Sequence, residues 1–131
     1  MDYDAYSGSC QTAAAMLDKG DAAGALAIFE RLIASDISDL DKAMMYHNAA
    51  TVLDRMGRVA EALRAYDRAI ALEWSYSRCD STERKAVFLA GKNDLAASLA
   101  LYEQLLLKPY ATEQDKARFR ANVEALRARL A

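Results

Sequence analysis

Cys10 and His47 are the residues of this sequence whose side chains are best suited to chemistry. They would form a nucleophile and its base if the fold brought them together, because imidazole activates a thiol by taking its proton. A repeat in the sequence places them at corresponding positions of neighbouring units. No third residue that would orient the imidazole is identifiable, so we interpret the two as neighbouring side chains on a binding surface, with His47 solvated. A thiol-dependent enzyme stays as a remote alternative.

The other candidate sites have simpler explanations. Asp80 with Glu83, and Asp39 with Asp41, stand where the first turn of a helix needs a capping carboxylate. The segment 20–24 contains two glycines but lacks the Gly-Lys-Ser/Thr ending and the preceding strand of a phosphate-binding loop. One histidine and two separate cysteines make no metal cluster. We therefore expect no enzyme activity, no metal and no cofactor.

Composition favours a helical protein that works with other proteins. The 131 residues include one proline and five glycines, and strong helix formers dominate, so we expect a single all-α domain over 1–131. A formal net charge of −2 without a basic stripe argues against nucleic acid as partner. No apolar run is long enough for a membrane helix. The absence of a CxxC pair and of a signal-peptide pattern predicts a cytoplasmic protein with reduced thiols.

A repeated pattern in the sequence predicts the helices that position Cys10 and His47. Aligning the chain with itself sets Gly20 on Gly57, Ala25 on Ala62 and Phe29 on Tyr66, and a weaker third copy contains Ser98 and Tyr102. In each copy a small residue is followed four positions later by an aromatic residue, so both lie on one helix face. The small residue allows close approach of a neighbouring helix, and the glycine before it ends the first helix of a pair.

The second copy resembles a tetratricopeptide repeat. The residues at that family's signature positions are Tyr46, Asn48, Ala50, Leu53, Gly57, Ala62, Tyr66 and Ala69. The first copy keeps Ala13, Met16, Gly20, Ala25, Phe29 and Leu32, and the third keeps Ala86, Leu89, Ser98, Tyr102 and Leu105. The third has Asn93 in place of the glycine, and asparagine also tolerates the left-handed conformation.

The resemblance implies an α-solenoid of three antiparallel helix pairs, a tetratricopeptide-like superhelix, with a capping helix. The repeats would cover about 6–39, 43–76 and 79–111, and the cap 112–130. We expect helices at about 6–19, 22–34, 40–56, 59–73, 81–91, 95–107 and 113–130, with Asp80, Asp94 and Thr112 as caps. The last helix would cover the third pair with Phe119, Val123, Leu126 and Leu130.

Partner peptides of the family that this chain resembles lie in the groove lined by the first helix of each pair. The corresponding residues here are Cys10, Gln11, Ala14 and Asp18 in the first repeat, Met44, His47, Asn48, Thr51 and Arg55 in the second, and Asp80, Glu83, Arg84 and Val87 in the third. Of the clamp that binds chaperone C-termini only Asn48 is present, so a free carboxylate is an unsuitable ligand for this groove.

The expected function is that of a protein-interaction module, an adaptor or small chaperone-like protein, which binds a partner segment in this groove. The acidic Asp18, Asp80 and Glu83 favour a partner with basic residues. The alternative is a structural subunit that self-associates through Trp74 and Tyr76, which stand where a proline turn is expected. We expect these aromatics to pack between the second and third pairs, in a monomer or weak homodimer.

Overall fold

The computed structural model describes all residues, 1–131, and the chain is all-α, as expected. The helices are α1 (Tyr3–Asp18), α2 (Ala22–Ile33), α3 (Asp39–Arg55), α4 (Val59–Glu73), the short 3₁₀ helix η1 (Trp74–Tyr76), α5 (Asp80–Gly91), α6 (Leu95–Leu106) and α7 (Glu113–Leu130). The bounds of α4 and α7 agree with the prediction. None of the helices has both the length and the apolar character needed to cross a membrane.

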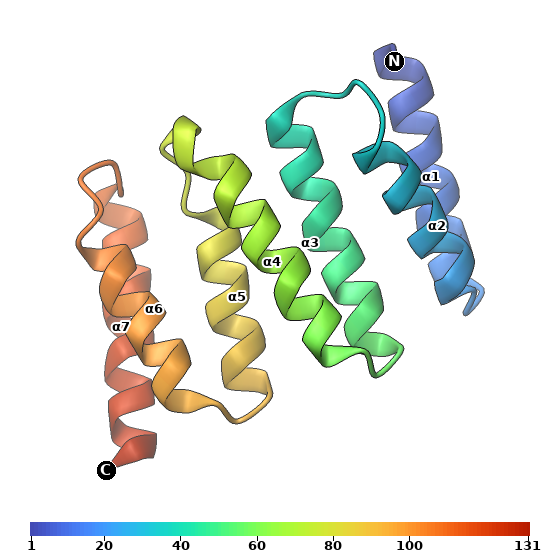
Figure 1. Ribbon diagram of the computed structural model, residues 1–131. Coiled ribbons are helices and arrows are strands. Elements are labelled where there is room, and N and C mark those ends of the chain that lie inside the picture. The colour runs from blue at the N-terminus through green and yellow to red at the C-terminus, as the bar shows by residue number, and fades with distance from the viewer. The chain divides into compact units, whose positions relative to one another are not determined.

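The chain separates into two compact units, Met1–Glu73 and Trp74–Ala131. In the first unit, α1 packs on α2, α2 on α3, and α3 on α4. In the second unit, α5 packs on α6 and α6 on α7. Within each unit consecutive helices run antiparallel (Figure 1), which is the packing of an α-solenoid. The single domain expected over 1–131 stays a prediction.

The small residues of the repeated pattern are buried where the helices pack. Ala25, Ala62 and Ser98 are fully buried, and the aromatic residues that follow them one turn later are buried as well. Ser98 also donates a hydrogen bond from its hydroxyl to the Ala86 carbonyl oxygen at 2.7 Å, which ties α6 to α5. A larger side chain at these positions would push the paired helices apart, so the pattern read from the sequence is a packing rule.

Left-handed residues end the first helix of each pair. Gly20 has φ of 82° and Gly57 has φ of 77°, a conformation that costs glycine little because it has no Cβ. Asn93 adopts φ of 63° at the same place in the third pair, as expected. These residues let the chain reverse within a short turn and begin α2, α4 and α6.

Two of the three expected caps are confirmed. Asp94 accepts a hydrogen bond from the Ala97 amide at 3.4 Å, and Thr112 forms a reciprocal capping box with Asp115. Asp80 was the wrong choice, because Cys79 is the cap of α5 and makes no side-chain bond there. Asp80 instead lies in the first turn, where its negative charge still favours the helix dipole.

Two other N-termini also differ from expectation. At α3 the cap is the Ser38 hydroxyl, which accepts from the Asp41 amide at 3.1 Å, so Asp39 and Asp41 lie inside the first turn. At α1 the helix begins earlier than expected, because the Asp2 carboxylate accepts from the Ala5 amide at 2.8 Å. Local hydrogen bonding therefore decided where both helices begin.

The core of the second unit joins α5, α6 and α7. Its buried members are Ala86, Tyr102, Leu105, Ala111, Phe119, Val123 and Leu126. The Tyr102 and Phe119 rings meet at 6.2 Å between centroids, so α7 covers α6 with an aromatic contact. Leu130, which was expected in the same apolar face, is half exposed, because the last turn of α7 extends beyond this core.

Candidate functional site

Helix α3 carries an open stripe, which consists of Met44, Asn48, Thr51 and Arg55. These residues recur three or four positions apart and therefore lie on one face of the helix. Met44 is 52% exposed, whereas its neighbour Met45 is 1% exposed in the core. Asn48 is partly buried, and Thr51 and Arg55 are exposed. The remaining faces of α3 pack on α2 and α4, so this stripe is the part of the helix that faces solvent.

Some polar groups of the open stripe already interact with their own helix. The Thr51 hydroxyl donates to the His47 carbonyl oxygen at 3.2 Å, one turn earlier. This bond leaves the Thr51 methyl group and a spare oxygen lone pair for an incoming chain. Arg55 stands in the last turn of α3, where a positive charge is favoured by the helix dipole. The stripe thus combines one long apolar side chain with amide, hydroxyl and guanidinium groups.

His47 does not belong to this open surface. It is 5% exposed, and its Nε2 lies 3.4 Å from Oε1 of Glu73, which is also 5% exposed, at the end of α4. The expectation of a solvated, groove-lining imidazole is therefore wrong. The reason is the helix geometry, since His47 points to the side of α3 that α4 covers. Its acidic partner is far away in the chain, so no local pattern around His47 indicates the pair.

Helix α1 carries a second stripe, and one end of it interacts with the first turn of α3. Tyr6, Cys10, Ala14 and Asp18 follow each other at intervals of four residues and share one face. Burial, together with the neighbouring side chains of Cys10 and Asp41, raises the pKa of the Tyr6 phenol well above its ordinary value. Asp41 lies in the first turn of α3, so the two helices meet here. Further along α1, Gln11, Ala14 and Asp18 are exposed and Cys10 is half-buried.

Cys10 and His47 have different neighbours in the structure. The thiol lies beside the Tyr6 phenol, and the imidazole faces the Glu73 carboxylate in the interior. A buried imidazole that already faces a carboxylate is poorly placed to meet a substrate together with a half-buried thiol on another helix. The predicted neighbourhood of the two residues therefore gives no support to thiol chemistry.

The groove residues of the second unit are described within that unit. Val87 is exposed, and Arg84 is exposed beside it on α5. Glu83 is occupied, because both its oxygens bind Arg118 of α7, at 2.7 Å to Nε and 3.0 Å to Nη2. Asp80 lies 3.8 Å from Arg78 in an exposed ion pair. A surface that joins these residues to α1 and α3 stays a prediction.

Arg118 pairs with two acidic residues of the second unit, Glu83 and Asp115. Its hydrogen bonds to Glu83 and Asp115 raise the pKa of its own guanidinium, and a bidentate pair of this kind is geometrically specific. The charge of Glu83 is therefore largely compensated within the chain. Among the acidic groove residues, Asp18 on α1 remains exposed without such a partner.

Trp74 and Tyr76 are exposed, contrary to the expectation that they are packed. Trp74 is 71% exposed, and both residues belong to η1, the short 3₁₀ helix. The Lys108 ammonium lies 4.8 Å from the centroid of the Trp74 ring, which is a cation–π contact within the second unit. Ser77 follows with φ of 55°, so the chain turns sharply here. Exposed aromatics of this size are typical of contact surfaces.

A pocket that sequence reasoning missed lies on the side of α3 opposite the open stripe. Its volume is about 340 Å³, and its lining comes from the end of α2 and from facing turns of α3 and α4. The lining residues are Ile33, Asp39, Lys42, Tyr46, Arg68, Ala71 and Leu72. Tyr46 was recognised as a repeat residue, but nothing in the spacing of Lys42 and Arg68 along the chain indicated that they flank it.

A scan of protein-family models finds no match to this sequence, and a search of curated proteins finds none either.

Proposed function

We propose that the protein is a tetratricopeptide-like interaction module that binds a segment of another protein on the exposed stripes of α1 and α3. The observation that carries this proposal is the contrast between two consecutive methionines of α3. Met45 fills the core, while Met44 holds a long apolar side chain in solvent. Methionine adapts its shape to different apolar surfaces, which suits a binding face. Its exposure costs free energy that a bound partner would recover.

The tetratricopeptide assignment rests on the packing. Fully buried small residues stand at the helix contacts of all three pairs, and left-handed residues end the first helix of each. The same geometry supports the assignment of α1 and α3 as the helices that face a partner, since α2 and α4 supply the covered sides. An extended or helical segment would lie across Met44 and Asn48, with the Asn48 amide bonding its backbone.

A capture experiment tests this function. The wild-type protein and the double variant Met44→Glu/Asn48→Lys are immobilised and exposed to lysate of the source cell, and the retained proteins are compared quantitatively. We expect at least one protein that is retained by the wild type and lost by the variant. A matched control, Arg64→Gln on the exposed side of α4, should retain it. Equal capture by wild type and double variant would contradict the assignment of this face.

Self-association through η1 is the second candidate, favoured by the exposure of Trp74 and Tyr76. A pair of exposed aromatic side chains can supply the centre of a contact between two copies. The molar mass of the protein in solution, measured over a range of concentrations, tests this directly. Mass that rises with concentration in the wild type and stays monomeric in Trp74→Ser would support it. A monomer at all concentrations would rule it out.

A further inference from the structure

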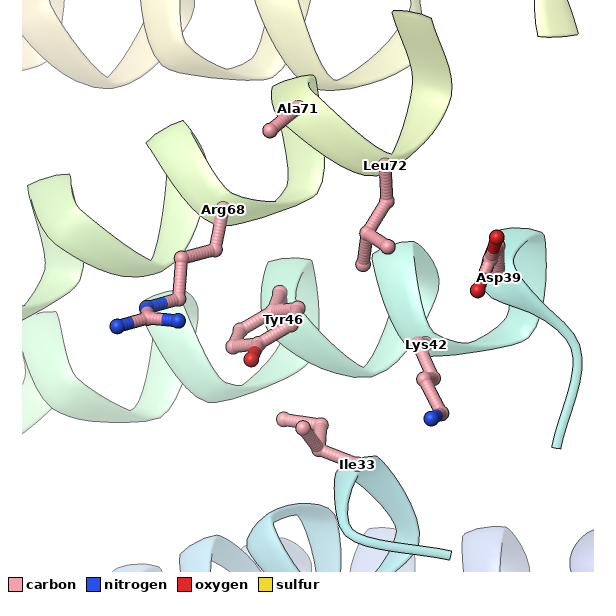
Figure 2. Close-up of a pocket in the computed structure, with 7 residues that line it drawn as sticks. All are labelled: Ile33, Asp39, Lys42, Tyr46, Arg68, Ala71 and Leu72. Atoms are coloured by element: carbon pink, nitrogen blue, oxygen red, sulfur yellow. The ribbon is translucent and has the colours of Figure 1, made fainter. Parts of the chain in front are cut away.

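The pocket between α2, α3 and α4 has a chemical character that the proposed function does not use. Lys42 and Tyr46 stand one turn apart on α3, and Arg68, Ala71 and Leu72 come from α4 (Figure 2). Ile33 at the end of α2 points toward the Tyr46 ring. Two cations and a phenol therefore surround apolar side chains, in a cavity of about 340 Å³. This volume lies at the lower end of the range of small ligand pockets and accommodates a few side chains.

The positive groups of the pocket are available to a ligand. Arg68 and Lys42 form no ion pair within the chain, and the Tyr46 hydroxyl forms no hydrogen bond there. Asp39 also lines the pocket, on the same side of Tyr46 as Lys42 (Figure 2), but no ion pair joins the two side chains. The nearby Asp36 is engaged mainly by the N-terminal ammonium of Met1 and more weakly by the charge of Lys42. The pocket therefore carries more positive than negative charge, although the chain as a whole is slightly acidic.

The placement of the two cations decides which kind of anion fits. Arg68 and Lys42 lie on opposite sides of the Tyr46 ring and come from different helices (Figure 2). A single compact anion such as phosphate would meet one of them and leave the apolar lining uncovered. A chain with two separated carboxylates and an apolar side chain between them would meet all three features. In an extended chain alternate residues point to the same side, so the fitting pattern is acid, any residue, apolar, any residue, acid.

We propose that this pocket binds an extended acidic segment of a partner protein, whose carboxylates pair with Lys42 and Arg68 and whose apolar side chain enters beside Tyr46, between Ile33 and Leu72. The site lies on the face of α3 opposite the Met44 stripe, so it is independent of the function proposed above. It would be selective for acidic partners, because a basic segment would meet uncompensated repulsion from the two cations.

Short labelled peptides test the proposal without knowledge of the partner. The probe is a capped Glu-Gly-Leu-Gly-Glu peptide, whose binding to the full-length protein is measured by fluorescence anisotropy at low and high salt. The comparison peptides are Gln-Gly-Leu-Gly-Gln, which lacks the charges, and Glu-Gly-Gly-Gly-Glu, which lacks the apolar side chain. We expect each comparison peptide to bind about tenfold more weakly, and added salt to weaken the acidic probe.

Matched variants locate the binding. Arg68→Gln and Lys42→Gln should each lower affinity for the acidic probe by about fivefold to tenfold. Arg64→Gln removes the same charge from α4 outside the pocket and should leave affinity unchanged, as should the Met44→Glu/Asn48→Lys variant. Circular dichroism checks that each variant is folded.

Several outcomes would overturn the proposal. The proposal would be contradicted if the acidic probe did not bind, or if the uncharged peptide bound as tightly as the acidic one. It would also be contradicted if Arg64→Gln lowered the affinity as much as Arg68→Gln does. Full competition by inorganic phosphate would reveal a site for small anions only. Binding to anionic phospholipid vesicles that depends on Lys42 and Arg68, without binding of the peptide, would assign the face to a membrane surface instead.

Discussion

His47 and Glu73 form a buried acid–base pair that joins α3 to the end of α4, at 3.4 Å between Nε2 and Oε1. Removing one member of such a pair leaves the other buried with an unsatisfied polar group or charge, which is more costly than removing both. The pair is therefore a structural contact of the first unit, and its disruption should be visible in stability.

We predict that Glu73→Gln lowers the free energy of unfolding by about 1–3 kcal/mol, measured by urea denaturation. His47→Gln should lower the free energy of unfolding less in the Glu73→Gln protein than in the wild type, because the two residues are coupled. The control is Glu61→Gln, which removes an exposed carboxylate from the same helix and should have a much smaller effect. Additive effects of the two substitutions would contradict the pairing.

The surroundings of Cys79 predict how its thiol reacts as the pH changes. Burial raises the pKa of this thiol, and the neighbouring Asp115 and Asp80 carboxylates raise it further. In Cys10→Ser protein, the rate of alkylation should therefore rise with pH around a midpoint above about 8.5, the value for a free thiol. The urea-unfolded protein is the control and should show the ordinary midpoint. A native midpoint at or below that of the unfolded chain would contradict the geometry around Cys79.

The same shift has a consequence for stability. A thiol whose pKa is higher in the folded than in the unfolded protein holds its proton more tightly when folded. Its contribution to stability is complete below the unfolded pKa of about 8.5 and is lost as the pH rises from there through the folded pKa. Stability of the wild type should consequently fall more steeply than that of Cys79→Ala over this alkaline range.

At the scale of the elements, α4 depends on the small residue that faces α3. Ala62 is fully buried at this contact, so Ala62→Leu forces a large side chain into a closely packed place. We predict a loss of about 1–3 kcal/mol in the free energy of unfolding. Ala60→Leu, at an exposed position of the same helix, is the control and should be nearly neutral. Unchanged melting of the Ala62 variant would mean that the repeat has been aligned in the wrong register.

A capping box formed by Thr112 and Asp115 begins α7. The Thr112 hydroxyl accepts from the Asp115 amide at 3.0 Å, and Asp115 Oδ2 accepts from the Thr112 amide at 3.2 Å. Thr112→Ala should cost about 0.5–2 kcal/mol in denaturant unfolding. Thr12→Ala is the control, because Thr12 lies inside α1 and alanine is the better helix former there. A larger loss at Thr12 than at Thr112 would contradict the capping role.

For the molecule as a whole, local rules predicted most of the fold. Helical periodicity and turn residues are properties of short segments, which is why the helices, the left-handed ends at Gly20, Gly57 and Asn93, and the buried Ala62 and Ser98 agree with the structure. The misplaced caps show the limit of this reasoning. Several polar residues near one helix start compete for the same amides, and small differences in geometry decide between Ser38 and Asp39.

The candidate site was less predictable, because it depends on contacts between distant residues. Met44 is exposed as a groove residue would be, but His47 turns inward to Glu73, and Glu83 is held by Arg118. Neither partner is a neighbour in the sequence. Trp74 has the hydrophobicity of a core residue, and only the three-dimensional structure reveals that it is exposed at η1. The pocket around Tyr46 likewise needs three helices to form.

The most direct measurement for the central claim uses the methionine methyl groups as reporters. Protein labelled with ¹³C at these methyls is titrated with the protein that the wild type captures, and the Met44 and Met45 signals are followed by nuclear magnetic resonance. We predict that the Met44 signal shifts or broadens upon binding, while that of the buried Met45 changes little. Binding that leaves Met44 unchanged while signals elsewhere move would contradict the assignment of the α1 and α3 stripes as the partner-binding face.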